Sequence, residues 1–253
     1  MANIINVLKC DSLQESKEEF RKIIQKAFDE HEGHYFTVGL SGGSLPAILA
    51  EVFPLIDTEW KKWRFFFCDE RLVSFNDPES TFGTYRSIVI PKIPEISLNQ
   101  FITIDPSLDS WAAANDYLSK MKQIFSRKSE IDFPRFDLLL LGMGPDGHTC
   151  SLFPNHPLLK ETKRWIAYVG DSPKPPPNRV TMTLPVLNNA KCCVFFVAGA
   201  AKAQIVKDIV VDGKLLPAGM VVPKKGDLYW ILDNESASML PEEHLKKMSV
   251  DLA

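Results

Sequence analysis

A histidine and an aspartate lie two residues apart in a glycine-rich segment near the middle of the chain. The segment reads Gly142-Met143-Gly144-Pro145-Asp146-Gly147-His148. Because imidazole titrates near neutral pH, His148 could take a proton from water and later return it. The Asp146 carboxylate could fix the tautomer of the ring and stabilise the imidazolium. The pair therefore predicts general acid–base catalysis, and the plainer alternative is a histidine that ties a tight turn together.

Two further polar segments could share a site with this pair. Ser41-Gly42-Gly43-Ser44 offers free backbone amides before a predicted helix, and such amides suit a carbonyl oxygen, an oxyanion or a phosphate. Asp69-Glu70-Arg71 offers two acids and a guanidinium. Arg71 could work near the reacting centre or pair with the acids beside it.

Two cations occur where they could hold a phosphate. Arg179 begins a stretch in which threonines alternate with apolar residues, and Lys202 opens a predicted helix after a buried strand. Their positions favour Arg179 and Lys202 over Arg71 and Arg86 as phosphate contacts. The remaining histidines are expected at the surface, and they are His31, His34, His156 and His244.

The elements that must position these groups follow from the pattern of apolar residues. Buried strands are predicted over 35–40, 63–68, 101–104, 136–141, 165–169, 194–198 and 228–232. Helices are predicted over 46–53, 81–90, 108–125 and 200–211, and another from a capping box at Ser12 to Gly33. This alternation predicts a single α/β domain over residues 1–253, with a mainly parallel sheet covered by helices on both faces. Ligands of such sheets bind outside the carboxyl ends of the strands, where the three polar segments are expected to meet.

Composition excludes several classes of protein. Over 253 residues, 29 Lys and Arg stand against 32 Asp and Glu, which argues against a nucleic-acid-binding protein. A hydrophobic content of 45% argues against long-range disorder. The longest apolar run, 194–201, is far shorter than the roughly 20 residues of a membrane helix, and residues 1–9 turn polar too soon for a signal peptide. We therefore expect no membrane partner and a cytoplasmic location.

The cysteines and histidines do not indicate a metal site. The five cysteines contain no C-x-x-C pair, and the histidines show no ligand spacing with them. We expect reduced and mostly buried thiols.

Two familiar motifs suggest other functions. Residues 39–43 match G-x-S-x-G, so Ser41 could be the nucleophile of an esterase with His244 as its base, although an anion-holding turn fits as well. Residues 142–147 match the dinucleotide fingerprint G-x-G-x-x-G, but prolines rather than a helix follow. The second match therefore does not predict a dinucleotide site.

Taken together, these segments resemble the 6-phosphogluconolactonase family over nearly the whole chain, and the likeness is close to its animal cytosolic members. The resemblance rests on residues 41–44, 68–71, 142–149, 178–181 and 199–202. It implies a Rossmann-like fold shared with the glucosamine-6-phosphate deaminases. It also implies hydrolysis of 6-phospho-D-glucono-1,5-lactone in the oxidative pentose phosphate pathway, without a required metal or organic cofactor.

The resemblance also implies roles for individual residues. His148 corresponds to the general base and Asp146 to its supporter, with Arg71 in the active site. Arg179 and Lys202 correspond to phosphate contacts, and the remaining candidates for substrate binding are Ser41, Gly42, Gly43, Ser44 and Asp69. As a partner, the resemblance implies a sugar-phosphate lactone, and we expect a monomer or a weak homodimer.

Two other functions stay open at this point. The deaminases share the Asp-Gly-His turn, but their pattern places a catalytic glutamate five residues after the histidine, where this chain has Phe153. Because an apolar ring cannot pass a proton, the position favours the lactonase. A sensor that binds a sugar phosphate without turnover is a further alternative.

Overall fold

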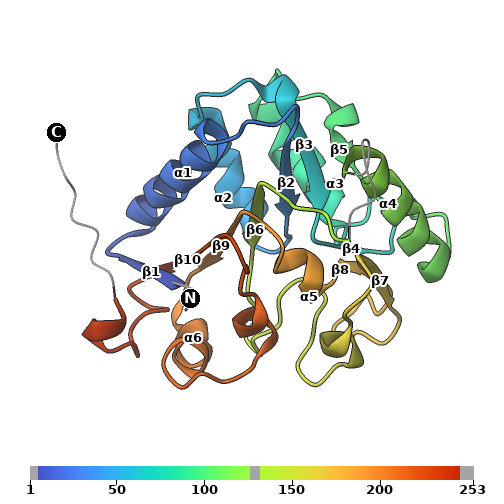
Figure 1. Ribbon diagram of the computed structural model, residues 1–253. Helices are drawn as coiled ribbons and strands as arrows, with labels where there is room; N and C mark the ends of the chain where they lie inside the picture. The colour runs from blue at the N-terminus through green and yellow to red at the C-terminus, as the bar shows by residue number, and fades with distance from the viewer. Residues whose placement is uncertain (1–4, 126–131, 246–253) are drawn as a thin grey trace.

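A computed structural model describes residues 5–125 and 132–245 of the chain. Within these residues, seven strands form one parallel sheet in the order β1-β10-β9-β6-β2-β3-β5 (Figure 1). Their bounds are Ile5–Cys10 (β1), Phe36–Leu40 (β2), Trp63–Phe67 (β3), Phe101–Ile102 (β5), Leu138–Leu141 (β6), Cys192–Val197 (β9) and Asp227–Asp233 (β10). A small antiparallel sheet has the order β4-β8-β7, with bounds Asp69–Arg71 (β4), Arg179–Met182 (β8) and Ile166–Val169 (β7).

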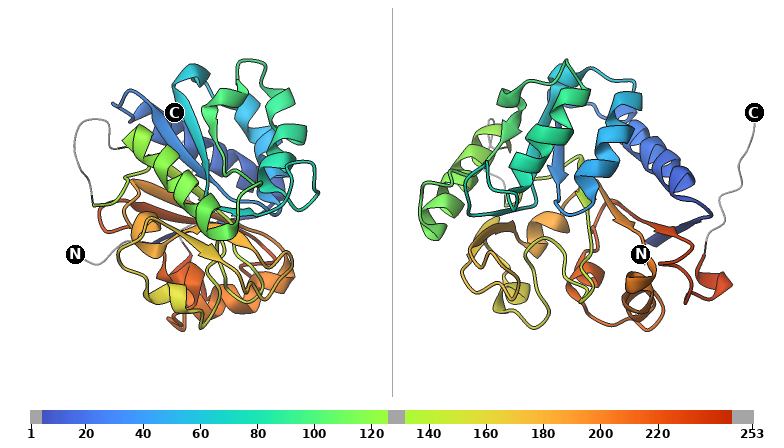
Figure 2. Two further views of the ribbon diagram at one scale, coloured as in Figure 1. Left: turned by 90° about the vertical axis from the view of Figure 1, so that its right-hand side faces the viewer. Right: turned by 180° about the vertical axis from the view of Figure 1, so that it is seen from behind.

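The helices cover both faces of the large sheet. Their bounds are Leu13–Asp29 (α1), Leu45–Val52 (α2), Thr81–Ile88 (α3), Ser110–Phe125 (α4), Leu184–Leu187 (α5) and Ala203–Val210 (α6). Helices α1, α2 and α3 pack on one face, and α4, α5 and α6 pack on the other together with the small sheet. Figure 2 shows α1 to α3 gathered in the upper half of the molecule, and α6 with the small sheet in the lower half.

Strand β6 shows why its sequence forms a buried central strand. Its four leucines are fully buried, and side chains on a strand alternate between the two faces. Leu138 and Leu140 join the core under α1 to α3, whereas Leu139 and Leu141 join the core on the opposite face. An unbroken apolar run is therefore what a strand between two helical layers requires.

The prediction of a mainly parallel sheet with helices on both faces is confirmed. The strand predicted over 165–169 is present as β7 (Ile166–Val169), but it belongs to the antiparallel sheet. The prediction of a loop at residues 69–71 was wrong, because these residues form strand β4. Strand β4 gave no apolar signal because its three residues are polar and pair through the backbone with β8.

Helix α1 begins as predicted and ends early. The Ser12 hydroxyl accepts a hydrogen bond from the Glu15 amide at 3.1 Å, which satisfies one free donor of the first turn. The helix ends at Asp29, and Glu30 caps it in a right-handed conformation. The predicted end at Gly33 was therefore wrong.

The chain passes from the large sheet to the small one at Cys68. Its amide donates to the Leu40 carbonyl at the end of β2, and its carbonyl accepts from the Met182 amide at the end of β8, both at 2.8 Å. This crossing brings Asp69 and Arg71 beside the segment that follows β2. Among the described helices, none is both long and apolar enough to cross a bilayer.

Candidate active site

A cavity of about 270 Å³ lies at the carboxyl ends of β2, β3, β6 and β9. We call it the catalytic pocket. Its lining residues are Ser41, Gly42, Gly43, Ser44, Asp69, Arg71, Gly142, Met143, Gly144, His148, Cys150, Arg179, Phe196, Val197, Ala198 and Lys202. Nine of the ten residues predicted from the sequence line this pocket, and the tenth, Asp146, contacts His148. The three polar segments and the two separate cations thus meet in one place.

The turn that carries His148 depends on glycine. Gly147 has a φ of +80°, and the Gly144 amide donates to the His148 carbonyl at 2.8 Å, which closes the turn. A Cβ atom on Gly144 would lie 2.0 Å from two atoms of the imidazole. The ring of Phe153 lies 4.9 Å from the imidazole, centre to centre. The histidine is therefore held between backbone and an aromatic side chain.

His148 and Asp146 form a close pair. The His148 Nδ1 atom lies 2.5 Å from Asp146 Oδ1. Donation from Nδ1 to the carboxylate leaves Nε2 as the nitrogen that can accept a proton. Burial opposes ionisation of Asp146, but the hydrogen bond from His148 and the charges of His148 and Lys174 outweigh it and lower the pKa of Asp146 to about 2. Burial lowers the pKa of His148 from its ordinary value, although Asp146 opposes this change.

The segment after β2 presents two backbone donors to the pocket. Gly43 has a φ of +69°, a conformation that glycine adopts without strain. Among the described residues, neither the Gly42 amide nor the Gly43 amide donates to an acceptor of the protein. Both amides are therefore available to an anion or an oxyanion.

Asp69 and Arg71 reach the pocket from β4 and have different partners. The buried Asp69 carboxylate accepts from the Ser151 hydroxyl at 2.8 Å. Arg71 Nη1 donates to the Glu79 carbonyl at 2.8 Å and to the Glu79 carboxylate at 3.1 Å. The Arg71 guanidinium therefore does not pair with the acids beside it. The Glu70 carboxylate accepts the Arg71 amide and the first amides of α3, at Thr81 and Phe82.

The two predicted phosphate contacts differ in how many hydrogen bonds they donate within the protein. Arg179 is 3% exposed, and its guanidinium donates to the carbonyls of Lys174, Pro175 and Pro176 at 3.0–3.2 Å. Lys202 is half-buried, and its amine donates to the Met143 carbonyl at 2.8 Å. Burial lowers the pKa of Lys202, and the neighbouring charge of Lys174 adds to this effect. Lys202 keeps donors for a ligand, whereas Arg179 mainly fastens the segment before β8.

Sequence reasoning missed Lys174, which reaches the catalytic pair. Its Nζ atom lies 3.3 Å from Asp146 Oδ1 and 3.2 Å from His148 Nδ1. The only sequence signal was its place in the proline-rich stretch 172–177, shortly before Arg179.

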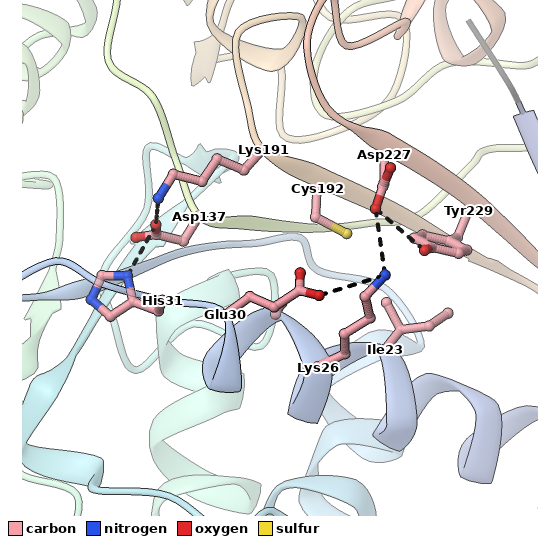
Figure 3. Close-up of a pocket in the computed structure, with 10 residues that line it drawn as sticks. Ile23, Lys26, Glu30, His31, Asp137, Lys191, Cys192, Asp227 and Tyr229 are labelled. Carbon is pink, nitrogen blue, oxygen red and sulfur yellow. Dashed lines mark hydrogen bonds and ion pairs between the residues drawn. The ribbon is translucent and has the colours of Figure 1, made fainter.

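A second cavity, of about 130 Å³, lies at the amino ends of β6, β9 and β10 (Figure 3). We call it the rear pocket. It is lined by Ile23, Lys26, Ala27, Glu30, His31, Asp137, Lys191, Cys192, Asp227 and Tyr229. The side chain of His31 is 4% exposed, so the expectation of a surface position was wrong. It is buried because its Nδ1 atom pairs with the Asp137 carboxylate at 3.2 Å.

All five cysteines are free and buried, as expected. Within residues 5–125 and 132–245, no three His, Cys, Asp or Glu side chains gather in a group that could hold a metal ion.

Comparisons with known proteins agree with this geometry. A family model described as "Glucosamine-6-phosphate isomerases/6-phosphogluconolactonase" matches residues 10–230. The chain is 48% identical over 226 residues to the 6-phosphogluconolactonase of Rattus norvegicus, with 86% of each chain covered, and 49% identical over 212 residues to that of Homo sapiens, with 81% of each covered. The solved 6-phosphogluconolactonase from Trypanosoma cruzi superposes with a TM-score of 0.82 at 26% identity, covering 95% of this chain and 98% of that one. The chain belongs to the glucosamine-6-phosphate isomerase/6-phosphogluconolactonase family.

Proposed function

We propose that the protein hydrolyses 6-phospho-D-glucono-1,5-lactone to 6-phospho-D-gluconate, as a step of the oxidative pentose phosphate pathway. The observation that carries the proposal is the pair of His148 and Asp146, 2.5 Å apart, in a pocket that also holds free amides and cations. The names of the related proteins support the same reaction.

The reaction begins with activation of water. His148 Nε2 takes a proton from water while the oxygen of that water attacks the lactone carbonyl carbon. The resulting oxyanion is stabilised by the amides of Gly42 and Gly43 or by the Arg71 guanidinium. Asp146 stabilises the imidazolium that forms, because its low pKa keeps the carboxylate charged.

The second half of the reaction opens the ring. The tetrahedral intermediate collapses and the bond from the carbonyl carbon to the ring oxygen breaks. The imidazolium of His148 donates its proton to the ring oxygen as that oxygen leaves. One water is consumed, the product is a carboxylic acid that ionises in solution, and His148 returns to its neutral form.

The cations of the pocket are proposed to hold the phosphate. Lys202 stands at the opening of α6 with one carbonyl partner, so its ammonium has donors left for phosphate oxygens. Arg179 lies farther inside and supports the phosphate site by its charge. Ser41, Ser44 and Asp69 line the same pocket as these cations and His148.

Three alternatives lose support at particular residues. An esterase nucleophile needs a base within hydrogen-bond distance, and the Ser41 hydroxyl is buried with no partner among the described residues. A deaminase would need an acid at position 153, and the Phe153 ring there packs against His148. A sensor without turnover has no use for a histidine that an aspartate orients.

The test is a rapid assay of the purified, chelator-treated protein. Freshly made 6-phosphoglucono-δ-lactone is followed against its spontaneous hydrolysis, with unphosphorylated gluconolactone in parallel. Acceleration of the phosphorylated lactone alone is expected. Binding of 6-phosphogluconate without any acceleration would instead favour the sensor.

We further propose that residues 1–253 act as a single domain, in the cytoplasm, as a monomer or weak homodimer. Support for one domain comes from the shared core, in which Val180 and Met182 of the small sheet pack with Leu139 and Leu141 of the large one. Free cysteines support a reducing compartment.

A further inference from the structure

Lys174 is a charged side chain beside the catalytic pair, and the reaction derived above gives it no role. Asp146 Oδ1 accepts from two sides, from His148 Nδ1 at 2.5 Å and from Lys174 Nζ at 3.3 Å. The two nitrogens lie 3.2 Å apart. Because Nδ1 carries a hydrogen when Nε2 is the base, it cannot accept from the lysine at the same time. The lysine therefore acts on the histidine through its charge and through the carboxylate that they share.

The backbone of Lys174 is fixed by two neighbours. The Ser172 hydroxyl donates to the Lys174 carbonyl at 2.8 Å and accepts from the Lys174 amide at 3.2 Å. The buried Arg179 guanidinium donates to the same carbonyl at 3.0 Å. The amine therefore extends from an anchored main chain, and its place beside Asp146 is part of the built site.

We propose that Lys174 is a positioning residue for the hydrolysis, which shares the Asp146 carboxylate with His148 and keeps the imidazole unprotonated until it accepts a proton from water. The proposal rests on the proposed function. Protonation of His148 in the free protein would place two cations 3.2 Å apart around one carboxylate oxygen. The same repulsion favours return of the proton from the imidazolium to the ring oxygen of the lactone.

Other charged groups around His148 act in both directions. Asp146 in the same turn and Asp69 on β4 favour the imidazolium, whereas burial and Lys174 oppose it. The cations of Lys202, Arg71 and Arg179 line the same pocket. Among the described residues, Lys174 is the cation within hydrogen-bond distance of both members of the pair, so its removal tests its own effect on the titration of His148.

The experiment compares Lys174→Met, which keeps the length of the side chain, with Lys174→Arg, which keeps the charge. Lys163→Met is the matched control, because Lys163 is an exposed lysine outside the pocket. The titration of His148 is followed by NMR with labelled histidine, and its signal is assigned from a His148→Gln spectrum. The pH profile of kcat/KM for the phosphorylated lactone is measured on the same proteins.

In Lys174→Met, the midpoint of the His148 titration and of the acid limb is expected to rise by about 0.5–1 pH unit, since a like charge this close shifts a pKa by about 1 or more when buried and less at a half-exposed site. Lys174→Arg should restore most of the shift, and Lys163→Met should show none. An unchanged midpoint, or a rise in KM alone, would overturn the proposal, because the latter marks a cation that only holds substrate. Inactivity of the unaltered protein would refute the proposed function, while the NMR titration would still decide the role of Lys174.

Discussion

Two of the histidine–aspartate pairs among the described residues lie at opposite ends of the large sheet, and they differ in whether a ligand can reach them. In the rear pocket, Asp137 accepts from His31, from the amide and hydroxyl of Thr37, and from Lys191. In the catalytic pocket, Asp146 accepts from His148 and Lys174 beside an open cavity. The two pairs contain the same residue types. They differ in how many hydrogen-bond donors and cations around them are free for a ligand.

The rear pair belongs to a local network of hydrogen bonds and ion pairs. The Nε2 atom of His31 is buried and has no partner among the described residues, so it is not exposed to solvent. The charges near it are matched within the fold, since Lys191 pairs with Asp137 and Lys26 lies between Glu30 and Asp227 (Figure 3). His148 is 17% exposed and faces free amides and cations. A histidine–aspartate pair alone does not mark a catalytic site. The free donors around the pair, which a ligand can use, mark it.

The largest expected contrast is in turnover. His148→Ala should lower kcat by about 10²–10⁴-fold, the usual contribution of a general base, with an unchanged circular dichroism spectrum. His31→Ala should leave kcat within about twofold, because its ring does not reach the catalytic pocket. Equal losses of kcat in the two variants would abolish the distinction between the pairs.

A substitution at a neighbouring residue can displace the imidazole while His148 itself is unchanged. Gly144→Ala would place a methyl group 2.0 Å from two ring atoms, so the ring must move. A displacement of about 1 Å can cost roughly 10²-fold in kcat, and a loss of this order is expected. Gly170→Ala is the matched control, since the nearest atom to the added Cβ lies 3.8 Å away. A fully active Gly144→Ala protein would show that the observed ring position is not the working one.

Lys202, one of the cations that line the catalytic pocket, can be removed separately. Lys202→Ala should lower kcat/KM for the phosphorylated lactone by about 10- to 100-fold, which corresponds to the loss of one charged hydrogen bond of about 1.5–3 kcal/mol. Unphosphorylated gluconolactone should be unaffected. Lys207→Ala, farther along the chain and paired with Asp212, is the control. An equal loss for both lactones would place Lys202 at the reacting centre and not at the phosphate.

The smallest effects on activity are expected at the rear pocket. Asp137→Asn removes a charge that four donors share, and it should destabilise the fold by about 1–3 kcal/mol while leaving kcat unchanged. Thermal unfolding should show a Tm lower by several degrees. Asp146→Asn is the reciprocal variant, and its main effect should be a reduced kcat. Reversed results would mean that the roles of the two pairs have been exchanged.

Much of the fold and of the catalytic pocket could be predicted from the sequence, because apolar runs mark buried strands and polar segments follow them directly. Ser41, Asp69 and His148 were found in this way. Lys174 was not, since its place depends on Arg179 anchoring a segment that has no regular structure. The burial of His31 was also missed, because its partner Asp137 is 106 residues away in the sequence.

The crossing of the chain at Cys68 has a thermodynamic consequence. One wall of the catalytic pocket, the segment after β2, belongs to the large sheet, and the opposite wall, with Asp69 and Arg71, belongs to the small one. A bound ligand that touches both walls adds a further link between two sheets that already share a core, and it opposes local unfolding of either one. Product at saturating concentration should therefore slow amide hydrogen exchange in β4 and β8 as well as around His148. Occupancy of the pocket therefore sets how often the small sheet unfolds locally.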